Sequence, residues 1–486
     1  MAVNLRVASS PNGTRNKFDN ELDFSSFGGS PSASGAANIA AVAAFNAAYA
    51  LLSGRTRLYV PPGIYNGNSG FNFANTAGIA GSSLVIDASG VTFTAPGGGQ
   101  NGVAISSGIV QGGDNAKETR IDTVGANAST VTLKTAGQTS RFSVSQWCCI
   151  SNGNMQGAGD PPNLAVFEYR KIQSIGTGTL TFTEPLTNSY FDTWPAYTAG
   201  RGGPATVFPM QGFWDQEVEF KGARFTDTGQ LCYGKPRVMQ WTDCTFDTYG
   251  PCPTINNLFR ALRCTANGSG GLEVDKCVNR IELIDCTIRA IDFQSASVNE
   301  LYVSNHAAMS GTPRWNGGAS RSNVFDGLTI GAGGIFRFGP MNYGVMGPTT
   351  MTNVSSPAAE FFNQTTPFSD MTEEGGGVLS YSGGPGAPSN TFHWWATPGS
   401  NAVLLDSSNN FARSFQISDV SQSDGRTYVH TNLPDPVPST INGRSAPWKI
   451  IAHPCADLTM TNCTGNSLFT THSGLPAGTP FNQWAL

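Results

Sequence analysis

Four charged residues in the middle of the chain have the types and the setting that acid–base chemistry needs. Asp247 ends a short apolar strand, and in the repeat described below it lies level with Asn267 and Arg289. Asp227 and Asp292 lie near the same predicted turn. Hydrolysis of a glycosidic bond uses two carboxyl groups about 5 to 9.5 Å apart, which is one or two strand spacings. We therefore predict Asp247, Asp292, Asp227 and Arg289 as catalytic residues.

Aromatic side chains around this turn are suited to contact with sugar rings. Tyr249 lies at the turn itself, and Trp194 and Trp315 lie on segments that we expect to fold over it. His393 begins a His-Trp-Trp run in a stretch rich in Gly, Pro and Ser. This run fits carbohydrate binding and equally a buried contact between subunits. The predicted substrate-binding residues are Tyr249, Trp194, Trp315, His393 and Trp394.

The elements that must position these residues repeat at intervals of about 20 residues, the signature of a solenoid. Five segments align, beginning at Val218, Met239, Phe259, Ile281 and Asn299. In this register one inward column holds Phe220, Trp241, Ala261, Leu283 and Leu301, and a second holds Ala223, Cys244, Cys264 and Cys286. Stacked coils about 4.8 Å apart bury like side chains on like. We therefore predict a solenoid in which the Cys column is a buried apolar ladder.

Two stretches interrupt this repeat. Residues 125–203 and 400–447 each run through a strand, a turn, a second strand and a loop rich in Pro and Asn. Within them, Tyr169–Leu186 and Ser414–Leu433 are predicted antiparallel hairpins with Gly-Thr-Gly and Asp-Gly turns. We predict two related β-rich insertions that project from the solenoid.

One segment near the start has the pattern of an amphipathic helix. From Asn38 to Leu52, apolar residues recur at spacings of three and four. The strand that follows reads Leu58-Tyr-Val-Pro-Pro-Gly-Ile-Tyr65. Helix and strand together resemble the opening of the pectate-lyase-like β-helix family, in which a helix caps the solenoid. This resemblance implies an all-β fold, a single-stranded right-handed parallel β-helix with an N-terminal capping helix.

A structural role competes with catalysis for the carboxylates. Glu219, Gln240, Arg260, Glu282 and Glu300 form a predicted outward column, and such exposed ion pairs usually contribute little free energy. The paired-Asp signature of polygalacturonase-like hydrolases is missing. So is a calcium-binding carboxylate cluster beside an Arg, as in pectate lyases. We predict no metal and no cofactor, and a lyase, a hydrolase and a simple binder all stay open.

Composition excludes several classes of protein. The net charge of −5 and the scattered basic residues argue against nucleic-acid binding. No apolar run is long enough to span a membrane, and the first residues lack the basic head and apolar core of a secretory signal. Ten cysteines in 486 residues are too sparse for a disulfide scaffold. We expect synthesis in the cytoplasm with reduced thiols.

These observations divide the chain into six predicted parts. They are an N-terminal arm or docking segment with exposed aromatics (1–34), the capping helix and first coils (35–122), an inserted β-rich module (123–203), the main β-helix (204–365), a second inserted module (366–450), and a final coil with a C-terminal tail (451–486).

The whole arrangement resembles phage tailspikes. This resemblance implies a virion spike, commonly a homotrimer, that recognises host-surface polysaccharide and in many cases cleaves it, with the N-terminal arm docked to other virion proteins. Two other functions stay open. One is a free-standing polysaccharide lyase or glycoside hydrolase, and the other is a non-catalytic structural or adhesive protein of the particle.

Overall fold

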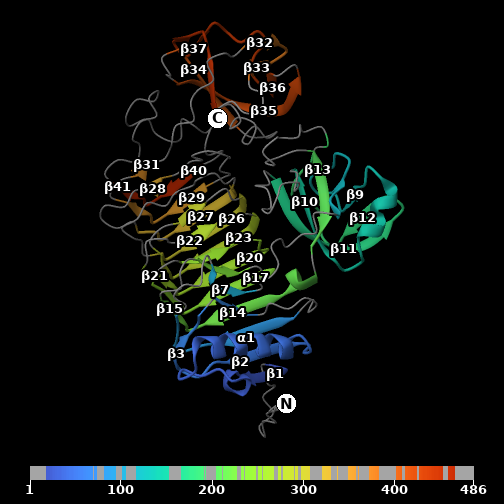
Figure 1. Cartoon of the computed structure of the whole chain (residues 1–486). Helices are drawn as coiled ribbons and strands as arrows, with labels where there is room; N and C mark the ends of the chain where they lie inside the picture. Colours follow the sequence, from blue (N-terminus) through green and yellow to red (C-terminus); the bar gives the residue numbers. More distant parts are fainter. Residues whose placement is uncertain are drawn as a thin grey trace.

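The computed structural model describes most of the strands of the chain. The described residues are 18–68, 70–73, 82–94, 101–105, 117–152, 166–190, 192, 204–210, 212–226, 231–234, 236–247, 250–253, 255–267, 272–274, 277–288, 291–293, 297–306, 320–329, 336–337, 349–356, 359–360, 372–382, 401–407, 411–423, 426–452 and 458–465. Short strands wind around one long axis, and two further β-rich units lie outside this coil (Figure 1).

The largest sheet, which we call the long sheet, contains eleven of the described strands, and all neighbours in it are parallel. Each strand comes from a successive coil. In spatial order they are β1 (Asn20–Asp23), β2 (Arg55–Tyr59), β5 (Ser83–Asp87), β14 (Glu217–Lys221), β17 (Val238–Thr242), β20 (Leu258–Leu262), β23 (Cys277–Ile284), β26 (Ser297–Ser304), β27 (Ser320–Asp326), β29 (Thr349–Thr352) and β40 (Leu458–Thr461).

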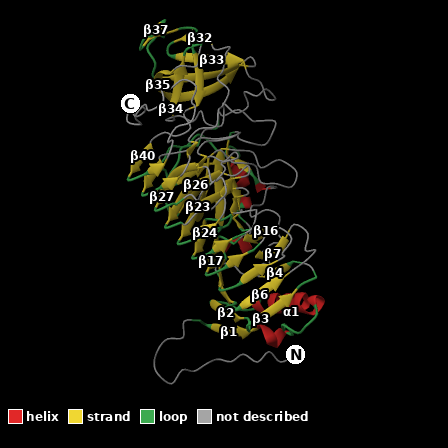
Figure 2. Ribbon diagram, turned by 90° about the vertical axis from the view of Figure 1, so that its left-hand side faces the viewer, coloured by secondary structure: helices red, strands yellow, loops and turns green. Residues whose placement is uncertain are grey.

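Two smaller parallel sheets close the coil (Figure 2). The second sheet contains β3 (Gly63–Asn66), β6 (Val91–Thr94), β15 (Arg224–Thr226), β18 (Thr245–Phe246), β21 (Thr265–Ala266) and β24 (Thr287–Ile288). The third contains β4 (Phe71–Phe73), β7 (Asn101–Ile105), β16 (Leu231–Gly234) and β19 (Pro251–Pro253). Later coils add three separate parallel pairs: β22 (Leu272–Val274) with β25 (Ile291–Phe293), β28 (Phe336–Arg337) with β31 (Ala359–Glu360), and β30 (Ser355–Ser356) with β41 (Thr464–Gly465). The predicted parallel β-helix is confirmed.

The inward column of the long sheet follows the predicted register over four coils and then departs from it. Phe220, Trp241, Ala261 and Leu283 are successive partners and are fully buried. The partner of Leu283 is Val303, however, so the predicted place of Leu301 was wrong by two residues. The error came from matching Glu300 to Glu282 by type. The observed register sets Glu300 beside Arg280, which avoids a like-charge pair on neighbouring strands.

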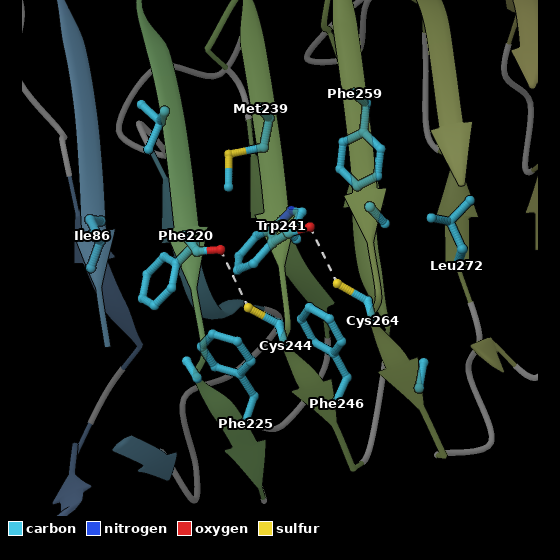
Figure 3. Packing of buried hydrophobic residues seen from close by; sticks show 14 of the residues in the cluster. Ile86, Phe220, Phe225, Met239, Trp241, Cys244, Phe246, Phe259, Cys264 and Leu272 are labelled. Atoms are coloured by element: carbon cyan, nitrogen blue, oxygen red, sulfur yellow. Dashed lines mark hydrogen bonds between the residues drawn. The ribbon is translucent and has the colours of Figure 1, made fainter. Parts of the chain in front are cut away.

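The predicted Cys ladder is confirmed. Cys244, Cys264 and Cys286 follow the long-sheet strands of consecutive coils, and each is about 1% exposed. Each thiol donates to a backbone carbonyl of the preceding coil: Cys244 to Phe220 at 3.4 Å, Cys264 to Trp241 at 3.3 Å and Cys286 to Ala261 at 3.2 Å (Figure 3 shows the first two). Burial raises the pKa of the Cys264 thiol, so it stays protonated and able to donate. These cysteines are structural donors in the core.

A turn with left-handed backbone precedes each residue of this ladder. The turn residue has a positive φ in eight described coils: Gly222 (69°), Asp243 (54°), Arg263 (51°), Asp285 (52°), Asn305 (47°), Gly327 (74°), Asn353 (54°) and Asn462 (53°). Gly, Asn and Asp tolerate this conformation best, which explains seven of the eight residues. Side chains also connect neighbouring turns, since Asn305 donates to Asp285 at 3.2 Å and Arg263 donates to Asp243 at 2.6 Å.

The N-terminal end of the coil is covered by α1 (Gly35–Tyr49), as predicted from the spacing of its apolar residues. Ser34 caps this helix by accepting from the Ala37 amide at 3.3 Å. The expected exposed aromatics of the N-terminal arm were wrong for Phe24, which is fully buried because residues 20–27 form the first strand and turn beneath α1. No helix in the described ranges is long and apolar enough to cross a bilayer.

Two antiparallel β modules are inserted in the coil: module 1 follows β7 of the third sheet, module 2 follows β31 of the pair β28–β31, and each precedes a long-sheet strand. Module 1 contains β8 (Thr119–Arg120), β9 (Thr130–Thr132), β10 (Trp147–Asn152), β11 (Val166–Gly176), β12 (Thr179–Phe182) and β13 (Ala205–Pro209). Module 2 contains β32 (Thr372–Gly375), β33 (Val378–Ser382), β34 (Asn401–Leu405), β35 (Phe411–Ser423), β36 (Arg426–Thr431) and β39 (Lys449–Ala452), with the small hairpin β37 (Thr440–Ile441) and β38 (Arg444–Ser445). Both predicted hairpins are present as β11–β12 and β35–β36. The predicted domain boundaries stay a prediction.

His306 continues the Cys column in the next coil. Its side chain is 1% exposed, Nε2 lies 3.4 Å from the Ile288 carbonyl oxygen, and Nδ1 has no hydrogen-bond partner among the described residues. Burial lowers the pKa of His306 to about 4. The imidazole is therefore neutral in the folded protein over a wide range of pH.

We expect this histidine to make the fold sensitive to mild acid. From pH 6.5 down to about pH 4 the unfolded chain takes up a proton that folded His306 does not. Stability is therefore complete above this window and falls by about 3 kcal/mol as the pH drops through it. Urea unfolding at neutral pH and near pH 5 measures the part of this loss that falls above pH 5, about 2 kcal/mol. His306→Leu should lose less stability over the same interval; an equal loss in both proteins would show that other groups cause it.

Candidate functional site

The outer face of the long sheet carries two adjacent lines of side chains along the axis. The first line holds Glu219, Gln240, Arg260, Glu282 and Tyr302, and the second holds Glu217, Val238, Leu258, Arg280 and Glu300. The predicted outward column is thus correct for its first four residues, and Tyr302 stands where Glu300 was expected. Because paired strands lie about 4.8 Å apart, these groups repeat at that interval. We call this surface the ladder face.

Ion pairs join neighbouring coils on the ladder face. Glu282 accepts from Arg260 Nε at 2.5 Å through one carboxylate oxygen and from Arg280 Nε at 2.7 Å through the other. Arg280 also donates to Glu300 at 2.5 Å. Arg260 extends the chain of contacts to Gln240 Oε1 at 3.3 Å. The network therefore runs over four coils, with alternating charge.

The members of this network differ in exposure. The side chain of Glu282 is 9% exposed, whereas those of Arg280 and Glu300 are 42% and 48% exposed. Burial of the Glu282 carboxyl disfavours its charge, but the hydrogen bonds and charges of Arg260 and Arg280 outweigh burial and lower its pKa. Glu282 is thus a fixed anion, and the exposed groups around it are available to a ligand.

Module 1 borders the ladder face through a polar junction centred on Asp215. Asp215 Oδ1 accepts from Trp147 Nε1 at 2.9 Å and from Arg237 Nε at 2.8 Å, and Lys171 Nζ lies 3.9 Å from Oδ2. The Arg237 guanidinium also lies 5.2 Å from the centre of the Trp147 ring and pairs with Glu217 of the ladder face. The junction connects β10 and β11 of module 1 with the start of β14.

A buried contact holds module 1 against the coil. Tyr169 donates to the Cys277 carbonyl at 2.8 Å, and its ring lies 4.6 Å from the ring of Trp214. Asn299 Nδ2 donates to the Phe167 carbonyl at 2.8 Å and to Asn279 Oδ1 at 2.8 Å. These donors and rings are fully or nearly buried, so module 1 is a fixed wall beside the ladder face.

The structure describes two of the predicted catalytic residues, Asp247 and Asp292, and places both outside the long sheet. Asp247 follows β18 of the second sheet, pairs with Arg224 Nε at 2.7 Å, and lies level with Asn267 as predicted. Asp292 belongs to β25, whose partner is β22, so the two residues belong to different sheets of the coil. The other predicted residues lie outside the described ranges: Asp227, Arg289, Tyr249, Trp194, Trp315, His393 and Trp394.

The Asp215 junction was not predicted from the sequence. Its members come from strands β10 and β11, the turn before β14 and the residue before β17, and no short motif links them. The one available signal was alternation in β11, which places Phe167, Tyr169 and Lys171 on one face of the strand. Only the docking of module 1 brings Trp147 and Lys171 to Asp215.

We expect Glu282 and Glu300 to differ sharply in their contribution to stability. Glu282→Gln leaves two arginines with a weaker acceptor in a mostly buried position and should lower the free energy of unfolding by about 1 to 3 kcal/mol. Glu300→Gln removes one exposed ion pair and should change it by less than about 0.5 kcal/mol. Denaturant unfolding of both variants measures the difference. Equal effects would show that burial of Glu282 does not govern the network.

Among known proteins, the chain is similar only to solved structures. No family model and no curated protein matches the sequence. Three tailspike structures each align with 88% of this chain at 10% identity. They are gp54 of Acinetobacter baumannii bacteriophage AP22 in complex with A. baumannii capsular saccharide (TM-score 0.29, 94% of that chain), gp49 from Pseudomonas phage LKA1 (0.30, 98%) and gp61 of Pseudomonas phage phi297 (0.30, 98%). The fold of this chain is established independently by its strand register.

Proposed function

We propose that the chain is a virion spike that recognises a host-surface polysaccharide along the ladder face beside module 1. The observation that carries the proposal is the regular line of polar side chains over successive coils, bordered by a fixed wall. A polymer of repeating sugars presents hydroxyl and charged groups at regular intervals, which a line of side chains at strand spacing can meet.

The exposed groups of the ladder face suit such a ligand. The Arg280 guanidinium is partly exposed and offers planar, directional donors to hydroxyl or carboxylate oxygens. Glu300 supplies acceptors in the next coil, and Tyr302 supplies a partly exposed ring for stacking. Acidic, neutral and amino sugars all have groups that fit this set, so the face supports binding of polysaccharide as a class.

Binding is better supported than cleavage. Glu217, Glu282 and Glu300 each pair with an arginine, and Glu219 accepts from Gln240 and Thr242 at 3.0 and 2.8 Å. The hydrogen bonds and charges of Arg260 and Arg280 lower the pKa of Glu282, so this carboxylate makes a poor general acid. Cleavage therefore stays a separate proposal. Its candidate residues are those predicted from the sequence: Asp247, Asp292, Asp227 and Arg289 for catalysis, with Tyr249, Trp194, Trp315, His393 and Trp394 for substrate contact.

Assembly distinguishes the spike from a free enzyme. Three chains in a stable particle and docking of the first residues to other virion proteins belong to the spike proposal. A free-standing lyase or hydrolase needs neither. Light scattering of the full chain in solution would give the mass of three chains for a spike, and the mass of one chain would favour the enzyme.

Two matched double variants test where the polysaccharide binds. Arg280→Gln with Glu300→Gln removes an exposed pair from the ladder face, and Arg224→Gln with Asp247→Asn removes an exposed pair from the second sheet. We expect the first to weaken binding to capsule or exopolysaccharide tenfold or more, about 1.4 kcal/mol, and the second to leave affinity within about twofold. Titration calorimetry measures both, with thermal unfolding as the control for folding.

The same samples report on cleavage. An increase in absorbance near 235 nm indicates a lyase, and new reducing ends without it indicate a hydrolase. Loss of either signal in the Arg224 and Asp247 double variant, with binding retained, would support catalysis at this pair. The ladder-face proposal fails if the Arg280 and Glu300 variant binds as the wild type does.

A further inference from the structure

Five strands of each inserted module have the same order, while the sixth strand lies at opposite edges: β8 beside β13 in module 1 and β32 beside β33 in module 2. In module 1 the order is β13-β10-β11-β12-β9, and in module 2 it is β39-β34-β35-β36-β33. These strands also occur in the same sequence order along the chain. In both modules the longest strand shifts register at the same place against its hairpin partner, after Ile172 in β11 and after Ile417 in β35. β35 shifts a second time against β34, at Ala412, where β11 pairs regularly with β10. Over these five strands the modules therefore share one topology and the position of the first bulge.

Residue pairing supports the match as far as Leu404, after which the modules differ: Ser151 pairs with Phe167, whereas Leu405 pairs with Phe411 and Ala412 is skipped. We align the two modules by placing Ile172 on Ile417. The cross-strand pair Ile150–Glu168 of module 1 then corresponds to the pair Leu404–Arg413 of module 2. The buried core positions correspond under this alignment: Val131 with Leu379, Ile150 with Leu404, and Leu180 with Val429. Backbone hydrogen bonds correspond too, since Thr183 N to Lys171 O matches Asn432 N to Gln416 O.

One difference lies at the edge by which module 1 docks. The Phe167 carbonyl accepts from Asn299 of the coil at 2.8 Å. The equivalent carbonyl of module 2, that of Ala412, accepts from Asn442 at 2.8 Å. Asn442 belongs to the turn of the β37–β38 hairpin of module 2 itself. The Phe167 carbonyl of module 1 therefore accepts from an asparagine of the coil. The Ala412 carbonyl of module 2 accepts from an asparagine of the module's own hairpin.

The hairpin is built to hold Asn442 at this place. Asn442 and Gly443 both have positive φ, 50° and 74°, as a two-residue hairpin turn requires. The neighbouring Ile441 is 9% exposed, and Trp448 is 7% exposed and donates to the Pro438 carbonyl at 3.1 Å. Ala412 is fully buried. The hairpin is thus packed on the module and is not a loose loop.

We propose that module 2 is a second copy of module 1 in which the β37–β38 hairpin acts as a strap over the docking edge. The strap supplies from within the module the contact that module 1 takes from the coil. Module 2 is therefore a self-contained unit whose opening is controlled by Asn442, whereas the opening of module 1 is controlled by its contact with Asn299. This inference does not depend on polysaccharide binding.

Backbone hydrogen exchange of the full chain tests the strap. Asn442→Asp keeps the shape of the side chain and its tolerance of positive φ but removes the amide donor. We expect exchange in β35 to increase about tenfold, as for one lost hydrogen bond, while exchange in β11 stays unchanged. Asn299→Asp should produce the reverse. Asn432→Asp is the matched control in module 2, because the Asn432 side chain accepts from Gln416 N at 2.9 Å, which an aspartate also does.

Two results would overturn the proposal. Unchanged exchange in β35 of the Asn442→Asp variant would show that the hairpin does not close the edge. Equal increases in β11, β35 and the long sheet would show that the two modules open together with the coil. Because the readout is exchange in separate peptides, a failure of the polysaccharide proposal leaves the result unaffected.

Discussion

In-register stacking of parallel strands is the constraint on which the rest of the molecule depends. Each coil places one side chain directly over the equivalent side chain of the preceding coil, so Phe220 stacks on Trp241 with ring centres 5.4 Å apart. Each ladder thiol donates across to the coil before it. The same register that fills the core also arranges Glu219, Gln240, Arg260 and Glu282 in one line on the outside. A slip of one residue would exchange the two faces.

The inserted modules interrupt the regular coil, and module 1 borders one part of its outer surface. Module 1 is held by buried rings and by Asn299, and its polar side meets the ladder face at Asp215. Asp215 draws donors from three separate parts of the chain, which fixes the wall while leaving Glu217 half exposed. Module 2 repeats the architecture with a hairpin in place of the coil contact. Contacts with the solenoid thus hold module 1, whereas the β37–β38 hairpin supplies the equivalent contact within module 2.

The fold was largely predictable because its signals are local and repeated. Cys244, Cys264 and Cys286 occur in matching contexts, and each hairpin has its own turn residues, so both features could be placed from the sequence. The predicted place of the fifth segment was wrong by two residues, because Glu300 and Glu282 are alike in the sequence and only the strand pairing, with Glu300 beside Arg280, shows the true register. The Asp215 junction could not be predicted, because its donors meet only through packing between module and coil. Asp247 was placed correctly beside Asn267, but its pairing with Arg224 depends on side-chain geometry.

The central claim is that the ladder face beside module 1 recognises polysaccharide. A crystal structure with a bound oligosaccharide from the host surface tests it most directly. The account predicts sugar rings along the coil axis, with hydrogen bonds to Arg280 and Glu300 and a ring against Tyr302. An oligosaccharide bound instead over Asp247 on the second sheet, with the ladder face empty, would contradict it.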